Sequence, residues 1–155
     1  MLAARPQSSG EPQCFSCQAM DESEQFQISL QTSGCIEYTG TVITYEEPDD
    51  KCKISLSFSN LTLTATDSDF FEAFCKIRIQ LEEYGILPIC FGASLNVYPS
   101  GMARNMDYGM KAYKLTLGQQ SRMNNLVEIF DTDSEVVPST VEDQKKFFNS
   151  WLASL

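Results

Sequence analysis

The sequence predicts an α+β fold, with a largely antiparallel sheet and two main helices, at about 68–84 and 140–155, packed on one face of it. Several segments alternate apolar and polar residues with the period of a half-buried strand, whereas only these two segments combine a long apolar stripe with helix-start signals. Parallel neighbours need long crossover connections, usually helices, and two helices are too few to supply them. The pattern therefore argues against a strictly parallel sheet.

The predicted strands of the first half form hairpins. Residues 26–30 alternate with the period of a strand, and the turn signal at 33–34 leads into a segment rich in Thr, Val, Ile and Tyr at 36–45. An acidic loop at 46–50 precedes the next alternating run. The alternation then changes phase at 59–60, so the sequence predicts a tight turn or a bulge there, because a one-residue slip would turn the side chains to the opposite face.

The first helix has the clearest pattern in the chain. One apolar stripe at helical spacing is formed by Phe70, Phe74, Ile77, Leu81 and Tyr84. Asp69 followed three residues later by Glu72 resembles a capping box, and Gly85 suits the left-handed residue that ends many helices. These signals predict a helix that begins after Asp69 and ends before Gly85.

The second half has weaker strand signals and a C-terminal helix. Pro88 within the apolar run 86–91 favours an edge strand. Residues 113–117 alternate again, and 126–130 fit either a short strand or one helical turn. Thr140 with Asp143 predicts the start of the last helix. Its expected apolar face consists of Val141, Phe148, Trp151, Leu152 and Leu155.

Composition indicates one folded domain. Residues 1–24 are rich in Pro, Ser, Gly and Gln and predict a flexible leader, so we expect a single α+β domain at 25–155. The hydrophobic content of 43% is sufficient for a core in a chain of 155 residues. The sequence contains no apolar run of membrane-spanning length, and its first residues lack the apolar region of a secretory signal. We therefore expect a cytoplasmic protein that does not bind a membrane.

The cysteines and the missing histidine limit the chemistry. The six cysteines are Cys14, Cys17, Cys35, Cys52, Cys75 and Cys90. Their spacing shows no compact disulfide framework, so we expect free thiols. Cys14 and Cys17 have the CxxC spacing of a zinc half-site or a redox pair, but no histidine and no second CxxC complete such a site. Without histidine the commonest general base is also absent, so the sequence predicts no catalytic residue, no metal and no cofactor.

A charge reversal points to binding. The chain has a formal net charge of -10, yet residues 84–127 contain four cations and one anion. The cations are Arg104, Lys111, Lys114 and Arg122, and the anion is Asp107. A strongly acidic protein attracts basic partners and repels nucleic acid, so we expect a protein partner and no nucleic acid. On this interpretation the positive island is a docking site exposed on an otherwise anionic molecule.

The segment 98–114 supplies the candidate site residues. It combines glycines, methionines, tyrosines and cations, residue types that protein interfaces use as anchors and adaptable contacts. The candidates for partner or anion binding are Tyr98, Ser100, Arg104, Tyr108, Lys111, Tyr113 and Lys114. Two alternatives stay open. Met102, Met106 and Met110, spaced by four, also fit the buried stripe of a helix. Ser100, Arg104 and Lys111 also fit a site for a small anionic molecule at a helix start.

The stretch ICFGASLNVYPSGMARNMDYGMKAYKL at 89–115 resembles sequences of small bacterial proteins. The acidic single-domain format is similar to that of immunity proteins, which neutralise toxins. Together with the acidic charge, the missing histidine and the segment 98–114, this resemblance predicts a non-enzymatic interaction protein of the immunity or inhibitor type that binds a basic partner. The second hypothesis is a module that binds a small molecule or anion through the segment 98–114.

Overall fold

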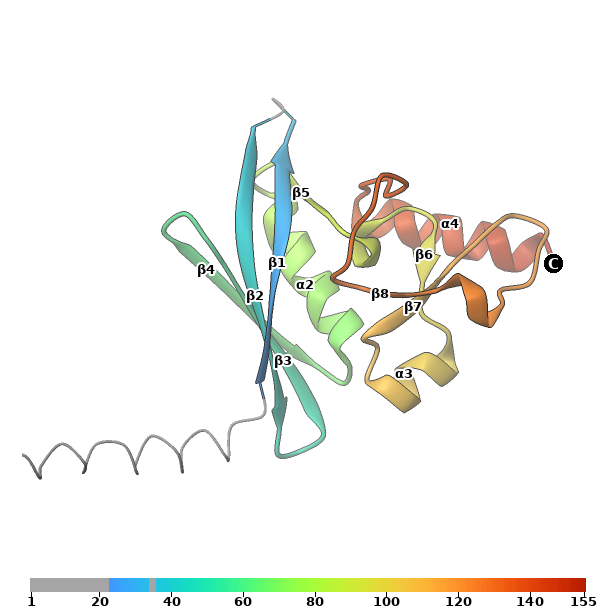
Figure 1. The fold of residues 1–155 in the computed structure, drawn as a ribbon, viewed down its shortest axis with the longest axis horizontal. Helices are drawn as coiled ribbons and strands as arrows, with labels where there is room; N and C mark the ends of the chain where they lie inside the picture. Colours follow the sequence, from blue (N-terminus) through green and yellow to red (C-terminus); the bar gives the residue numbers. More distant parts are fainter. Residues whose placement is uncertain (1–22, 34–35) are drawn as a thin grey trace, which may run out of the picture.

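The computed structural model describes residues 23–33 and 36–155. Within them it confirms the predicted α+β fold, with a curled five-stranded antiparallel sheet, three helices and a small second sheet (Figure 1). Most of the predicted leader lies outside the described residues, as do the Cys14–Cys17 pair and Cys35. The first strand already includes Ser23 and Glu24, so it begins earlier than the predicted domain boundary.

The large sheet is a run of antiparallel hairpins in the strand order β4-β3-β2-β1-β5. Its strands are β1 (Ser23–Thr32), β2 (Glu37–Glu47), β3 (Lys51–Phe58), β4 (Leu61–Asp67) and β5 (Ile86–Ile89). The predicted phase change is a two-residue turn between β3 and β4, with Ser59 at φ +54°. This turn places Leu56 opposite Leu63, so both strands turn their apolar side chains towards the core. Pro88 lies in the edge strand β5, as the sequence predicts.

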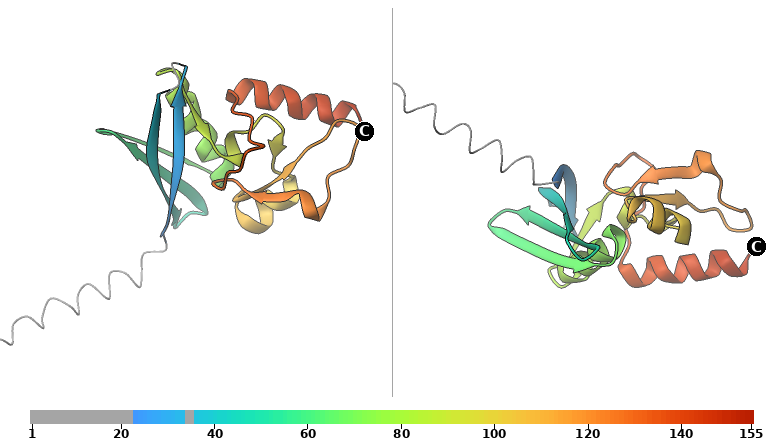
Figure 2. Two further views of the ribbon diagram at one scale, coloured as in Figure 1. Left: turned by 45° about the horizontal axis from the view of Figure 1, so that its top comes forward. Right: turned by 90° about the horizontal axis from the view of Figure 1, so that it is seen from below.

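Helix α2 (Phe70–Glu82) covers one face of the large sheet, and Figures 1 and 2 show it between the two sheets. The Asp69 side chain accepts a hydrogen bond from the Glu72 N–H at 2.8 Å, which confirms the predicted N-cap. The four helical members of the predicted stripe are buried. The prediction that Tyr84 belongs to this stripe is wrong, because Tyr84 follows the helix and is exposed. Gly85 has φ +72°, as its predicted place after the helix requires.

The second half of the chain forms a smaller layer beyond α2. Its elements are η1 (Phe91–Ala93), β6 (Val97–Tyr98), α3 (Gly101–Asp107), β7 (Lys111–Lys114), η2 (Met123–Asn125), β8 (Leu126–Glu128) and α4 (Val141–Ala153). The strands β6, β7 and β8 make an antiparallel sheet in that order. Residues 126–128 are therefore strand, which decides between the two alternatives that the sequence leaves open for this segment.

Helix α4 starts as predicted, because the Thr140 Oγ1 accepts a hydrogen bond from the Asp143 N–H. Its packing partners differ from the expectation. It contacts β6 and α2 and lies farther from the large sheet (Figure 2). Gln144 and Trp151 are its buried residues, whereas Leu152 and Leu155 of the predicted apolar face are exposed. The helix is thus held by a polar contact and an aromatic one rather than by a wide apolar stripe.

A buried Arg78 joins α2 to α4. Its guanidinium donates hydrogen bonds to the Gln144 Oε1 at 2.6 Å, to the Gly92 carbonyl at 3.1 Å and to the Ser139 carbonyl at 3.0 Å. The Gln144 amide in turn donates to the carbonyls of Gly92, Ser94 and Val97. Arg78 is 1% exposed, and burial lowers its pKa. Buried carbonyls need hydrogen-bond donors, and the Arg78 and Gln144 side chains supply them to the segments that connect α2 with α4.

Cys52, Cys75 and Cys90 are free thiols buried in the core, as the sequence predicts. Burial raises the pKa of Cys75 to about 11 and that of Cys90 to about 12. An unfolded chain ionises its thiols near the ordinary pKa of 9.0, so these groups stabilise the fold fully below that pH. Their contribution is lost as the pH rises through the folded-state values.

We therefore expect the free energy of unfolding, measured with urea, to fall between about pH 9 and pH 11. A Cys75→Ala/Cys90→Ala variant is the control, because it keeps every lysine and tyrosine that titrates in the same range. Its stability should fall less steeply with pH than that of the wild type. Equal slopes in the two proteins would show that ionisation of these thiols is not coupled to folding.

Candidate interaction surface

The segment 98–114 folds into β6, α3 and β7. Helix α3 starts at Ser100, whose Oγ accepts a hydrogen bond from the Ala103 N–H at 3.0 Å. It ends where Tyr108 and Gly109 both have left-handed backbone, with φ +53° and φ +77°. Two such residues in succession reverse the chain and start β7 at Lys111. The segment thus presents a short helix beside a strand.

Arg104 attaches α3 to the start of α2. Its guanidinium lies 2.9 Å from the Asp69 Oδ2 and 3.0 Å from the Glu72 Oε2, and it packs over the Phe71 ring at 5.2 Å and the Tyr98 ring at 5.7 Å. Burial lowers the pKa of Arg104, but the hydrogen bonds and charges of the two carboxylates raise it by more. The Glu72 side chain is engaged here, so the predicted capping box is formed by Asp69 alone. Arg104 therefore has a structural role.

The two lysines of the island also have acidic neighbours. Lys111 lies 3.5 Å from Asp107, and Lys114 lies 3.2 Å from Glu135 and 3.7 Å from Asp133. The expectation of an exposed positive docking site is therefore wrong for three of its four cations. Folding brings carboxylates from other segments against Arg104 and Lys114, whereas Lys111 pairs with Asp107 of its own segment. Arg122 is exposed and forms no ion pair within the described residues.

The three groups of the suggested anion site are not brought together. The Ser100 hydroxyl caps its own helix, and the Arg104 guanidinium faces α2 and its carboxylates. Lys111 lies in β7, against Asp107 and beside three hollows that Arg104 does not line. This arrangement offers no convergent set of donors to an anion.

The exposed methionines are the distinctive feature of this region. Met102, Met106 and Met123 are 68%, 76% and 74% exposed, so the interpretation of Met102 and Met106 as a buried stripe is wrong. Met110 lies past the end of α3 and packs partly buried against the core. The helix thus turns two of its long apolar side chains to water.

These methionines border one hollow of about 350 Å³ between α3, β7 and η2. We call its apolar lining the methionine surface: Met102, Ala103, Met106, Tyr113, Met123 and Leu126. The Tyr113 hydroxyl donates to the Met123 sulfur at 3.7 Å, which links β7 to η2. Methionine is unbranched and polarizable, so such a lining adapts to different apolar shapes.

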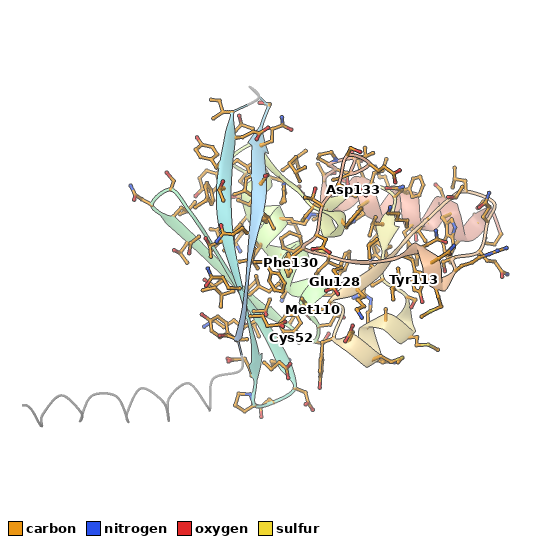
Figure 3. The ribbon with its side chains drawn as sticks, viewed as in Figure 1. Cys52, Met110, Tyr113, Glu128, Phe130 and Asp133 are labelled. Atoms are coloured by element: carbon orange, nitrogen blue, oxygen red, sulfur yellow. The ribbon has the colours of Figure 1, made fainter. Side chains whose placement is uncertain are left out.

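A second hollow of about 490 Å³ adjoins the first, because both are lined by Asp107 and Lys111. It lies between the ends of β1 and β2 and the α3–β7 turn, and Figure 3 labels Met110 and Glu128 there, between the large sheet and α3. We call it the acidic hollow for its carboxylates: Glu24, Glu46, Asp107 and Glu128. Tyr108 and Lys111 also line it, and Lys111 pairs with one of the four acids.

The predicted site residues are divided among several places. Tyr98, Ser100 and Tyr113 border a third, apolar hollow of about 230 Å³ against α4, where the Tyr98 ring stacks on Phe148 at 4.2 Å. Burial raises the pKa of Tyr98. Lys114 faces away from this hollow, with its ammonium 5.1 Å from the Phe91 ring.

Comparisons with models of known protein families and with curated proteins give no match. The geometry therefore carries the functional argument. Within residues 23–33 and 36–155, no cluster of side chains has the composition of a metal site. In the same part of the chain, no helix combines the length and the apolar character needed to span a membrane.

Sequence reasoning missed the residues that complete the two hollows. Met123 and Leu126 come from η2 and β8, and they join the surface only because β8 pairs with β7. Glu24 and Glu46 come from the far end of the first hairpin. Glu128 is the cross-strand partner of Lys111. An isolated methionine or glutamate in a polar segment does not indicate which residues lie beside it in the fold. These residues could be assigned to the hollows only if the pairing of the strands were already known.

Proposed function

We propose that this chain is a non-enzymatic, cytoplasmic interaction protein of the immunity or inhibitor type, and that it binds a basic protein through the methionine surface. The observation that carries the proposal is the exposure of three methionines around one hollow. Single exposed apolar residues are ordinary on protein surfaces, but apolar side chains gathered around a concavity are typical of interaction sites. The methionine surface therefore supplies the apolar contacts of the complex.

Charge supports the choice of partner. The net charge of -10 makes the protein anionic as a whole, and the acidic hollow with its four carboxylates adjoins the methionine surface. Such a field accelerates encounter with a basic protein and opposes nucleic acid, whose phosphates it repels. The absence of histidine from the sequence supports a binding role over a catalytic one, since it removes the commonest proton-transfer group.

The test is a selection from a displayed peptide library on the wild type and on a Met106→Glu variant. Because Met106 is exposed, the substitution should change the free energy of unfolding by less than about 0.5 kcal/mol. We expect the wild type to enrich peptides that combine apolar with basic residues, and the variant to lose them.

The matched control is Tyr84→Glu, which places the same charge on an exposed apolar residue after α2. Its selected peptides should be those of the wild type. Enrichment that survives Met106→Glu, or a wild-type selection that enriches acidic or no peptides, would contradict the proposed function.

A further inference from the structure

The acidic hollow has the make-up of a site for a cationic side chain with an apolar stem. Buried Phe70, partly buried Met110 and exposed Tyr108 all line it. Three of its carboxylates, those of Glu24, Glu46 and Glu128, form no ion pair within the described residues. The hollow therefore offers both apolar contact and unneutralised negative charge.

Strand register fixes two sides of this hollow. Glu24 of β1 pairs with Thr44 of β2, and Glu46 follows Thr44 on the same face of the strand. On the opposite side, Glu128 of β8 is the cross-strand partner of Lys111 in β7. The carboxylates are therefore carried by two separate sheets, which hold them around a common space without their having to be neighbours in sequence.

We infer that the acidic hollow receives an arginine side chain of the partner, while a large apolar side chain of the same segment packs on the methionine surface. This inference rests on the proposed function and specifies the chemistry of the segment that is bound. The two hollows share Asp107 and Lys111 and therefore adjoin, so one short segment can reach both. In a helical segment, an apolar residue and an arginine four positions apart lie on one face, so the two side chains can enter adjoining hollows.

Arginine fits better than lysine for a physical reason. Its planar guanidinium donates to several carboxylates at once, stacks on an aromatic ring such as Tyr108 and is more weakly hydrated than an ammonium. Lysine brings one compact, strongly hydrated charge. The Lys111 ammonium already pairs with Asp107 at the border of the hollow, so an incoming cation meets the remaining three acids.

The test uses short helical peptides with one leucine and one arginine on the same face, together with versions that carry lysine, or neutral citrulline, in place of the arginine. Affinities are measured by NMR titration against the full chain. We expect the citrulline peptide to bind about tenfold more weakly than the arginine peptide, with the lysine peptide between them. Equal affinities of the arginine and citrulline peptides would overturn the inference.

Two variants locate the effect. In Glu46→Gln/Glu128→Gln, the difference between the arginine and citrulline peptides should largely disappear. In Glu37→Gln/Glu83→Gln, which removes the same charge from exposed positions outside the hollow, it should persist. A difference reduced equally in both variants would mean that net charge alone attracts the arginine, and would refute a specific site.

Failure of this inference can be distinguished from failure of the proposed function. If all three peptides bind equally and Met106→Glu abolishes the binding, the methionine surface is confirmed and the arginine site is refuted. If no peptide binds the wild type, or Met106→Glu changes nothing, both proposals are refuted. The variants are exchanges at surface positions, and their folding is checked by comparing the amide spectra with that of the wild type.

Discussion

Replacing Arg78 with methionine is expected to lower the free energy of unfolding by about 3–5 kcal/mol, because it leaves the buried Ser139 carbonyl and Gln144 Oε1 without donors, while the Gly92 carbonyl keeps only the Gln144 amide. The guanidinium serves the carbonyls of Gly92 and Ser139 and the Gln144 side chain, and water does not reach them in its place, since Arg78 is 1% exposed. Methionine restores apolar volume but donates nothing. The loss is a large part of the stability of a typical domain.

The comparison with Arg78→Lys separates hydrogen bonding from charge. Lysine keeps the positive charge, but its single ammonium cannot reproduce the planar fork that serves three acceptors. Urea unfolding should therefore show that both variants are strongly destabilised. A methionine variant within about 1 kcal/mol of the wild type would mean that the buried charge costs nearly as much as its hydrogen bonds contribute.

Replacing Gly109 with alanine is expected to lower the free energy of unfolding by about 2–4 kcal/mol. Two effects add up, because the backbone at this position is left-handed and the added methyl group makes a close contact. Gly109 has φ +77°, and an added Cβ would lie 3.0 Å from both the Asp69 Oδ1 and the Phe71 N. Those atoms belong to the N-cap and first turn of α2, where Phe70 donates its N–H to the Tyr108 carbonyl. The substitution would thus push α3 away from α2.

Gly118→Ala is the matched control for this prediction. Gly118 also has a positive φ, +81°, but a Cβ there meets nothing within 4 Å. This substitution should lower the free energy of unfolding by about 1–2 kcal/mol, through the strain of the left-handed backbone alone. Comparing the two by urea unfolding isolates the contact between α3 and α2. Equal losses of unfolding free energy in the two variants would show that α3 moves to accommodate the added methyl group at no further cost in stability.

Local signals in the sequence predict an element well where the spacing of the apolar residues and a capping or turn residue indicate the same boundary. The spacing of the apolar residues and the Asp69 cap place α2, and the change of phase at 59–60 predicts the β3–β4 turn. The packing of α4 was harder to foresee, because its Gln144 is buried by partners from α2 and η1. A glutamine within a helix gives no indication that it will satisfy buried carbonyls.

The charge island shows why the site could not be predicted from one segment. Arg104 and Lys114 look unpaired within residues 84–127, but their acids come from Asp69, Glu72, Asp133 and Glu135 outside that window. The spacing of the methionines also led to a wrong expectation, because it suggested buried side chains where the structure has exposed ones. Spacing by four indicates a helix face, but whether the face is buried depends on what the rest of the fold places against it.

The most direct test of the docking surface is NMR of the methionine methyl groups during titration with the leucine–arginine peptide. The chain has six methionines, so each resonance can be assigned by a single Met→Leu substitution. The account predicts that the methyl resonances of Met102, Met106 and Met123 shift together, with one common affinity. A titration in which the peptide binds while these three resonances stay unchanged would contradict it.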